Sequence, residues 1–84
     1  MYNLARGDVV VYVSPKDPSN LLIKRVLAIE GENINSKRDY RDPVVIIPEG
    51  HIWVEGDNEK NTVDSNEYGP VSKVVNSVKS IDVP

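Results

Sequence analysis

Short runs of β-branched and other apolar residues, each followed by a polar stretch with proline or glycine, most limit what this chain can fold into. The runs Val9–Val13 and Leu21–Ile29 are followed by Ser14–Asn20 and Glu30–Glu32, respectively. Valine and isoleucine pack well on a pleated surface, and turn residues at both ends of a run are typical of strands. The first third of the chain therefore predicts two strands separated by a loop.

The rest of the chain predicts further strands and one long loop. Val44–Ile47 is a short third strand, and the turn Pro48–Gly50 leads into a fourth strand, His51–Glu55, so we expect these two to form a hairpin. The polar stretch Gly56–Pro70 is long for a connection and predicts a functional loop. Val71–Val83 predicts a turn followed by a strand. The fold class expected is mostly β, as a small antiparallel β barrel or sandwich.

Length and charge limit the possible functions. The 84 residues suffice for one small domain, which we expect to span residues 1–84. The formal net charge is −3, and the densest basic group is divided by acidic residues, so no nucleic-acid partner is expected. A solvated hairpin loop accounts for that group. It consists of Lys37, Arg38 and Arg41, with Asp39 and Asp42 between them.

No metal or cofactor is expected. The chain has no cysteine, which excludes disulfides and thiolate metal sites. It has a single histidine, His51. His51 follows a turn and starts a strand, so a turn-flanking role is favoured over membership of a Ser-His-Asp triad. No apolar run reaches the roughly 20 residues that a membrane span requires.

Three stretches, in this order, carry a resemblance to a known family. They are Arg6-Gly7-Asp8-Val9-Val10, then Ile23-Lys24-Arg25-Val26, then Gly56-Asp57-Asn58 followed by Asp64-Ser65 and Gly69-Pro70. Together they resemble the type I signal peptidase family. Within that family, Pro48–Asp57 and Asp64–Ser72 are most similar to the subunit 2 branch of the mitochondrial inner membrane peptidase.

The resemblance implies a serine endopeptidase in which a lysine, rather than a histidine, is the general base. Lys24 occupies the matching position. A free lysine is almost wholly charged at neutral pH, so a lysine base needs an apolar setting that disfavours the ammonium. On a strand, Lys24 shares a face with Leu22, Val26 and Ala28, which predicts such a setting, and Arg25 points the other way.

The resemblance also implies a hydroxyl that orients the lysine, from the loop after Gly-Asp-Asn. Thr62 stands at this position, where family members often carry serine, and Ser65 is the alternative hydroxyl. Either side chain can donate and accept a hydrogen bond. An ordinary loop hydroxyl that makes local turn bonds is the other interpretation of both residues.

Four further residues are expected to support the site. Asp57, Asn58 and Asp64 predict tight turns, because Asx side chains bond to backbone amides. The resemblance implies an ion pair between Arg25 and Asp57 that fixes the strand bearing Lys24.

The family's nucleophilic serine lies in a Ser-Met-x-Pro setting after a membrane anchor, upstream of the first matching strand. We therefore expect both the nucleophile and the anchor to be absent from this chain. The resemblance implies that the protein removes signal or sorting presequences at the mitochondrial inner membrane, faces the intermembrane space and pairs with a related subunit. The alternative is a catalytically lapsed or truncated subunit that acts as a binding or structural partner.

Overall fold

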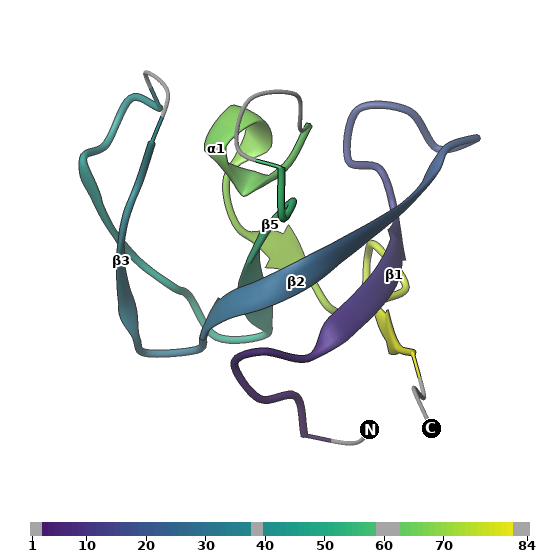
Figure 1. The fold of residues 1–84 in the computed structure, drawn as a ribbon, viewed down its shortest axis with the longest axis horizontal. Helices are drawn as coiled ribbons and strands as arrows, with labels where there is room; N and C mark the ends of the chain where they lie inside the picture. The colour runs from purple at the N-terminus through teal and green to yellow at the C-terminus, as the bar shows by residue number, and fades with distance from the viewer. Residues whose placement is uncertain (1–2, 38–39, 59–62, 82–84) are drawn as a thin grey trace.

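Two antiparallel sheets and one short helix make up the part of the chain that the structure describes (Figure 1). The computed structural model describes residues 3–37, 40–58 and 63–81. The larger sheet has the strand order β6-β5-β2-β1-β7. Its strands are β1 (Val9–Val13), β2 (Leu21–Ile29), β5 (His51–Glu55), β6 (Val71–Ser72) and β7 (Lys79–Ser80). The predicted mostly β, antiparallel fold is confirmed.

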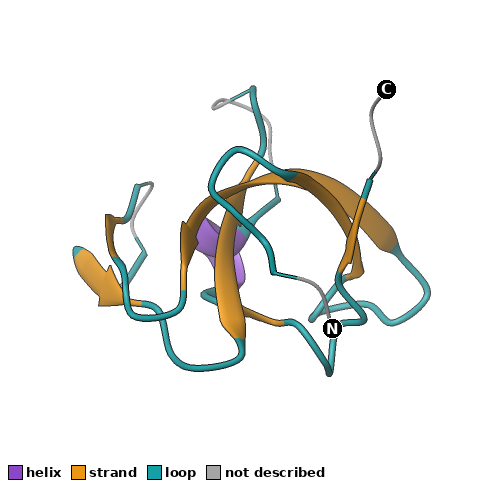
Figure 2. Cartoon of the chain, turned by 90° about the horizontal axis from the view of Figure 1, so that it is seen from below, coloured by secondary structure: helices purple, strands orange, loops and turns teal. Residues whose placement is uncertain are grey.

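Strand β2 is shared between two partners. Leu21–Arg25 pairs with β1, whereas Arg25–Ile29 pairs with β5, with a register shift between Val26 and Ala28. In Figure 1 this long strand crosses from β1 towards β5, and Figure 2 shows how strongly the sheet curves. Within the described residues, no strand pairs with Leu21–Lys24 on the side facing away from β1.

Two clusters of buried apolar residues lie on the two faces of β5. Ile52 and Val54 belong to the first cluster, whereas Trp53 belongs to the second. Burying one large apolar side chain contributes about 1.5–3 kcal/mol, so β5 is held from both sides. The other buried members are Leu4, Val10, Tyr12, Val26 and Val71 in the first cluster, and Ala28 and Ile47 in the second.

A hairpin of β3 (Asn33–Asn35) and β4 (Val44–Ile46) covers the second cluster. Ile34 and Val45 face each other across this pair and pack against the cluster. Their neighbours Val44 and Ile46 lie on the other face and are exposed. The alternation of a strand thus explains why two of the three apolar side chains of β4 remain in solvent.

The predicted hairpin between Val44–Ile47 and His51–Glu55 is wrong. Strand β4 pairs with β3, and β5 pairs with β2 and β6. The reason is burial: Ile52–Glu55 is buried throughout, which requires a central position in the sheet. A polar segment, Asn33–Asn35, supplies the partner of β4 instead.

The loop between β3 and β4 turns partly inward. The sequence predicts a solvated hairpin loop here, and residues 36–43 do connect the two strands. However, the Tyr40 ring packs edge-on against Trp53, with 5.3 Å between ring centroids and 84° between planes. Edge-on pairs of aromatic rings are favourable beyond their buried area. Arg38 and Asp39 lie outside the described residues.

The polar stretch after β5 contains a one-turn helix, α1 (Ser65–Tyr68), where the sequence predicts only a loop. Asp64 caps its start, because its carboxylate accepts a hydrogen bond from the backbone N–H of Asn66. Gly69 ends the helix with φ 84°, and its N–H bonds to the Ser65 carbonyl. No helix in the described ranges is long and apolar enough to cross a membrane.

The C-terminal segment is a strand, a turn and a second strand, whereas the sequence predicts a turn followed by one strand. Between β6 and β7, the Asn76 side chain donates to the Val13 carbonyl at 3.0 Å and accepts from the Ser72 amide at 3.2 Å. These bonds attach the turn to β1. A buried amide side chain thus adds to the pairing of β7 with β1 at this edge.

We predict that Gly69→Ala destabilises the fold more than Gly31→Ala. Both glycines have positive φ, 84° and 80°, so alanine is strained at either position, and the ψ of −168° at Gly69 lies in a region that is essentially confined to glycine. At Gly69 a Cβ would also lie 2.6 Å from the Tyr40 hydroxyl, whereas nothing lies within 4 Å at Gly31. Urea midpoints of the two variants measure the difference. Adding Tyr40→Phe to Gly69→Ala should recover part of the loss, and equal midpoints for both alanine variants would contradict the clash.

Candidate functional site

Lys24 is half-buried on β2, at the point where the strand passes from one partner to the next. The pairs Arg25↔Glu55 and Val26↔Val54, continued by one residue, set Lys24 across from Gly56. Lys24 is therefore next to the start of the polar loop. Among the described residues, the Lys24 amine makes no hydrogen bond or ion pair.

Arg25 joins three segments around Lys24. Its guanidinium forms a bidentate ion pair with Asp57, with N–O distances of 3.1 and 3.2 Å, and donates to the Gly7 carbonyl at 2.9 Å. The expected Arg25–Asp57 pair is thus present. Hydrogen bonding and then charge attraction raise the pKa of Arg25 and lower the pKa of Asp57. The side chains are 42% and 74% exposed, so this pair is solvated.

The structure describes only one of the two predicted hydroxyls. Thr62 lies outside the described residues. Ser65 is fully buried at the start of α1, and its Oγ accepts a hydrogen bond from the Val54 amide at 2.9 Å. Its own hydroxyl proton stays available to an acceptor. The structure shows no hydrogen bond between Ser65 and Lys24, both of which are described.

Asp64 fixes both ends of the loop. The side chain is fully buried, and its two carboxylate oxygens accept from the amides of Asn66 at 2.9 Å and Gly56 at 3.1 Å. Asn58, in contrast, is exposed. The loop thus begins and ends at the same carboxylate, beside Gly56 and across from Lys24.

Glu55, which the sequence analysis does not single out, is a buried carboxylate at the end of β5. It is 4% exposed and accepts three hydrogen bonds, from Trp53 Nε1 at 2.9 Å, Asn66 Nδ2 at 2.9 Å and Lys37 Nζ at 3.0 Å. Strand alternation, which sets Glu55 on the face of Trp53, is the signal that could have found it. We call Glu55, Trp53, Asn66 and Lys37 the Glu55 network.

The charge of Glu55 is well compensated. Burial acts to raise its pKa, but the hydrogen bonds from Trp53, Asn66 and Lys37 and the charge of Lys37 outweigh burial, so the pKa lies below its usual value. A buried charge persists only with such partners. The carboxylate is therefore ionised at neutral pH.

Asn66 connects the Glu55 network to the loop. Its side-chain amide donates to both Glu55 and Asp64, and its Oδ1 accepts from the Lys37 amide at 2.6 Å. In this chain a hydrogen bond of 3.2 Å joins Asn66 Nδ2 to Asp64.

A second polar contact that the sequence did not reveal joins the hydroxyls of Tyr12 and Tyr68. Burial raises the pKa of both, and that of Tyr68 reaches about 12, although its bond to Tyr12 acts in the opposite direction. Tyr12 is buried in the first cluster and Tyr68 ends α1, so the bond attaches the helix to β1. Both hydroxyls are neutral at physiological pH.

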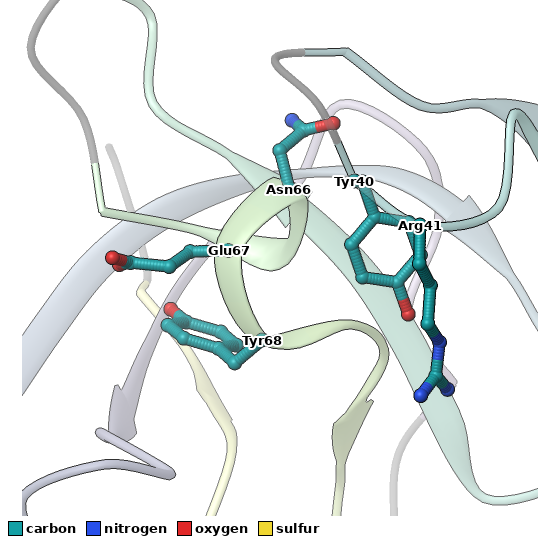
Figure 3. A pocket seen from close by; sticks show the side chains of 5 residues that line it. All are labelled: Tyr40, Arg41, Asn66, Glu67 and Tyr68. Atoms are coloured by element: carbon teal, nitrogen blue, oxygen red, sulfur yellow. The ribbon is translucent and has the colours of Figure 1, made fainter.

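The surface beside α1 is hollowed. A polar hollow of about 250 Å³ is lined by Tyr40, Arg41, Asn66, Glu67 and Tyr68. Figure 3 shows Tyr40 and Arg41 on one side of α1, with Glu67 and Tyr68 pointing to the other. Lys24 is not among the lining residues. Within the described ranges, no three His, Cys, Asp or Glu side chains are arranged to hold a metal ion.

Comparisons with known proteins agree on one family. The family model described as "Signal peptidase, peptidase S26" matches residues 1–46. Mitochondrial inner membrane protease subunit 2 of Schizosaccharomyces pombe is 44% identical over 78 residues, which are 93% of this chain and 43% of that protein. Subunit 1 of Homo sapiens is 43% identical over 72 residues, 83% of this chain and 43% of that protein. The chain thus spans less than half of these relatives' length.

One solved structure has the same fold. A crystal structure of a signal peptidase I from Enterococcus faecalis superimposes with a TM-score of 0.77 and covers 99% of both chains. The sequence identity is 19%, so this likeness concerns the fold alone.

We predict that Asp57→Ala has a small, salt-dependent effect on stability, because solvated ion pairs contribute little. The matched control is Asp42→Ala, which removes a carboxylate that pairs with Arg41 at 3.2 Å in solvent. The bidentate geometry should make the shift in urea midpoint larger for Asp57→Ala than for the control. In about 1 M salt the two shifts should converge. A large shift that salt does not change would contradict this prediction.

We also predict that Glu55 contributes to acid unfolding. Its pKa is lower in the folded state than the usual 4.5, so the unfolded state binds more protons in this range. The stability that Glu55 contributes is therefore present above about pH 4.5 and is lost as pH falls through the folded pKa. Stability measured from pH 7 to pH 2 should fall less steeply for Glu55→Gln. The control is Glu67→Gln, and identical slopes for the two variants would contradict the prediction.

Proposed function

Because the chain belongs to the signal peptidase S26 family, we propose that it is the base-bearing core of a serine endopeptidase with Lys24 as general base. One observation carries the proposal. Lys24 is half-buried on the inward face of β2, across from a loop that buried hydrogen bonds hold in place. A base must be held at a fixed position beside the nucleophile to act on it.

The proposed chemistry is acyl transfer. The neutral Lys24 amine takes the proton of a serine hydroxyl as this oxygen attacks the scissile carbonyl, and the ammonium then gives the proton to the leaving amine. Backbone amides stabilise the oxyanion. The printed sequence contains no Ser-Met-x-Pro motif. We therefore propose that a segment outside the 84 residues supplies the serine and the oxyanion donors.

A hydroxyl next to the amine orients its lone pair. We propose Thr62 for this role, with Ser65 as the alternative. Ser65 is buried at the start of α1, and its Oγ is fixed by the Val54 amide. Arg25, Asp57, Asn58 and Asp64 are proposed as structural support.

The open side of β2 suits an extended substrate. Leu21–Lys24 lacks a strand partner on the side away from β1 among the described residues, and unpaired backbone groups of this kind bind extended peptides. Leu21 and Ile23 are 66% and 61% exposed and add apolar contact area. We propose that a signal or sorting presequence lies along this edge, so that its scissile bond reaches Lys24.

The protein locates to the mitochondrial inner membrane, as the names of relatives with 40% to 46% identity indicate. We further propose that the catalytic core faces the intermembrane space and attaches to the membrane through a segment outside this chain. Both subunit 1 and subunit 2 proteins are similar to it, which supports pairing with a related subunit. The substrates would be presequence-bearing proteins.

A catalytically lapsed or truncated subunit is the second candidate. The observation in its favour is that the fold is present while Ser65, the described candidate for the orienting hydroxyl, makes no hydrogen bond to Lys24. Such a subunit would bind a partner or a presequence without cleaving it.

An activity measurement on two versions of the protein tests the proposal. The printed chain should not cleave a fluorogenic presequence peptide, because losing the nucleophile removes almost all of the rate gain. An extended protein that carries an upstream serine segment, either its own or that of the S. pombe relative, should cleave the peptide. Lys24→Met should reduce this cleavage by about 10³-fold or more.

The matched control is Lys79→Met, which removes an exposed strand lysine on β7. It should leave cleavage unchanged. Cleavage by the extended protein that survives Lys24→Met would overturn the assignment of the base. An extended protein that binds the peptide but does not cleave it would favour the lapsed subunit.

A further inference from the structure

Helix α1 cannot hold its own position. It has four residues, far fewer than a helix needs to be stable alone in water. Its bonds to β5 are polar: Ser65 Oγ accepts from Val54, and Asp64, the cap residue, accepts from Gly56. The location of Ser65 therefore depends on side chains that bind α1 from outside the helix.

Glu55 is the buried group at the centre of these bonds. One carboxylate oxygen accepts from Trp53 and from the Asn66 amide of α1, and the other accepts from Lys37 of the β3–β4 loop. Asn66 is fixed further, because its Oδ1 accepts from the Lys37 backbone amide. The helix and the hairpin loop thus meet at one carboxylate.

A contribution to stability is a weak explanation for burying the Glu55 carboxylate. A buried ion pair loses its hydration, and apolar residues of similar volume often stabilise a fold as well or better. Directional hydrogen bonds, however, fix a position that apolar contacts would leave free to slide. Strand alternation also sets Glu55 on the Trp53 face of β5, away from the Val54 face that neighbours Lys24. Glu55 can therefore affect the base site only through another residue.

We propose that Glu55 is a positioning residue for the base site: it acts through Asn66 to hold α1 at the end of β5, and with α1 the Asp64 carboxylate that binds the amide of Gly56, across from Lys24. Lys37 ties the β3–β4 hairpin to the same carboxylate, so the hairpin and the base site move together. The proposal rests on the proposed function for its catalytic consequence. Its structural part stands on the Glu55 network alone.

Amide hydrogen exchange of the 84-residue chain tests whether Glu55 holds α1 in place. The Val54 and Gly56 amides donate to Ser65 and Asp64, so their exchange reports how firmly α1 is held. In Glu55→Gln, the exchange of both should rise by about tenfold or more relative to the core amide of Val26. The same local change is expected for Asn66→Ala, which breaks the connection at its other end.

The matched control is Glu67→Gln. It makes the same chemical change on the same helix, but Glu67 is exposed and pairs with Lys16 in solvent. It should leave the exchange of Val54 and Gly56 unchanged. Exchange that rises equally at all amides in Glu55→Gln, or no more than in Glu67→Gln, would show that Glu55 serves general stability and would overturn the proposal.

Kinetics of the extended protein test the catalytic part. Glu55→Gln should lower kcat by roughly 10- to 100-fold with little change in KM, because a misplaced base site slows the chemical step more than it weakens binding. An unchanged kcat would overturn the proposal. If the extended protein shows no Lys24-dependent cleavage at all, the proposed function fails instead, and the exchange pattern still decides whether Glu55 holds α1.

Discussion

The divided pairing of β2 is the constraint on which the rest of the structure depends. Because Leu21–Arg25 pairs with β1 and Arg25–Ile29 pairs with β5, the sheet turns at Arg25, and no strand of the described residues pairs with the other side of Leu21–Lys24. Lys24 is thereby half-buried, yet it lies next to this open edge. A base that must be desolvated and also reach a substrate needs this combination.

Arg25 reinforces the turn in the sheet from the outer face. Its guanidinium binds Gly7, just before β1, and Asp57, just after β5. Arg25 thus joins the two strands that pair with β2. The exposed pair adds little to stability, but a planar fork that binds three acceptor oxygens limits rotation of β2 about its axis. Such rotation would change the direction of the Lys24 side chain.

The sequence predicted the strands whose apolar runs are continuous and missed the elements made of polar residues. Val9–Val13, Leu21–Ile29 and His51–Glu55 match the predicted bounds, because valine, isoleucine and tryptophan favour strands by themselves. Asn33–Asn35 and Ser65–Tyr68 have no such preference and form because distant residues bond to them. The hairpin was misassigned for the same reason: the true partner of β4 is asparagine-rich and carries no strand signal.

The direction of a side chain on a strand could be predicted from alternation, whereas contacts between residues that are distant in the sequence could not. A period of two sets Lys24 on the face of Leu22 and Val26, but the register shift after Val26 places Ala28 in the second cluster, so the prediction that Ala28 shares this face is wrong. Alternation also sets Glu55 on the face of Trp53, but a glutamate is rarely buried without partners, and the sequence does not show which partners it has. Its burial requires an ammonium from Lys37 and an amide from Asn66, which lie 18 and 11 residues away in the sequence. Because these partners come from the β3–β4 loop and from α1, a change in either element alters the compensation of the Glu55 charge. The hairpin loop and α1 are therefore held by the same buried carboxylate, which is why neither contact can be read from the residues near Glu55 alone.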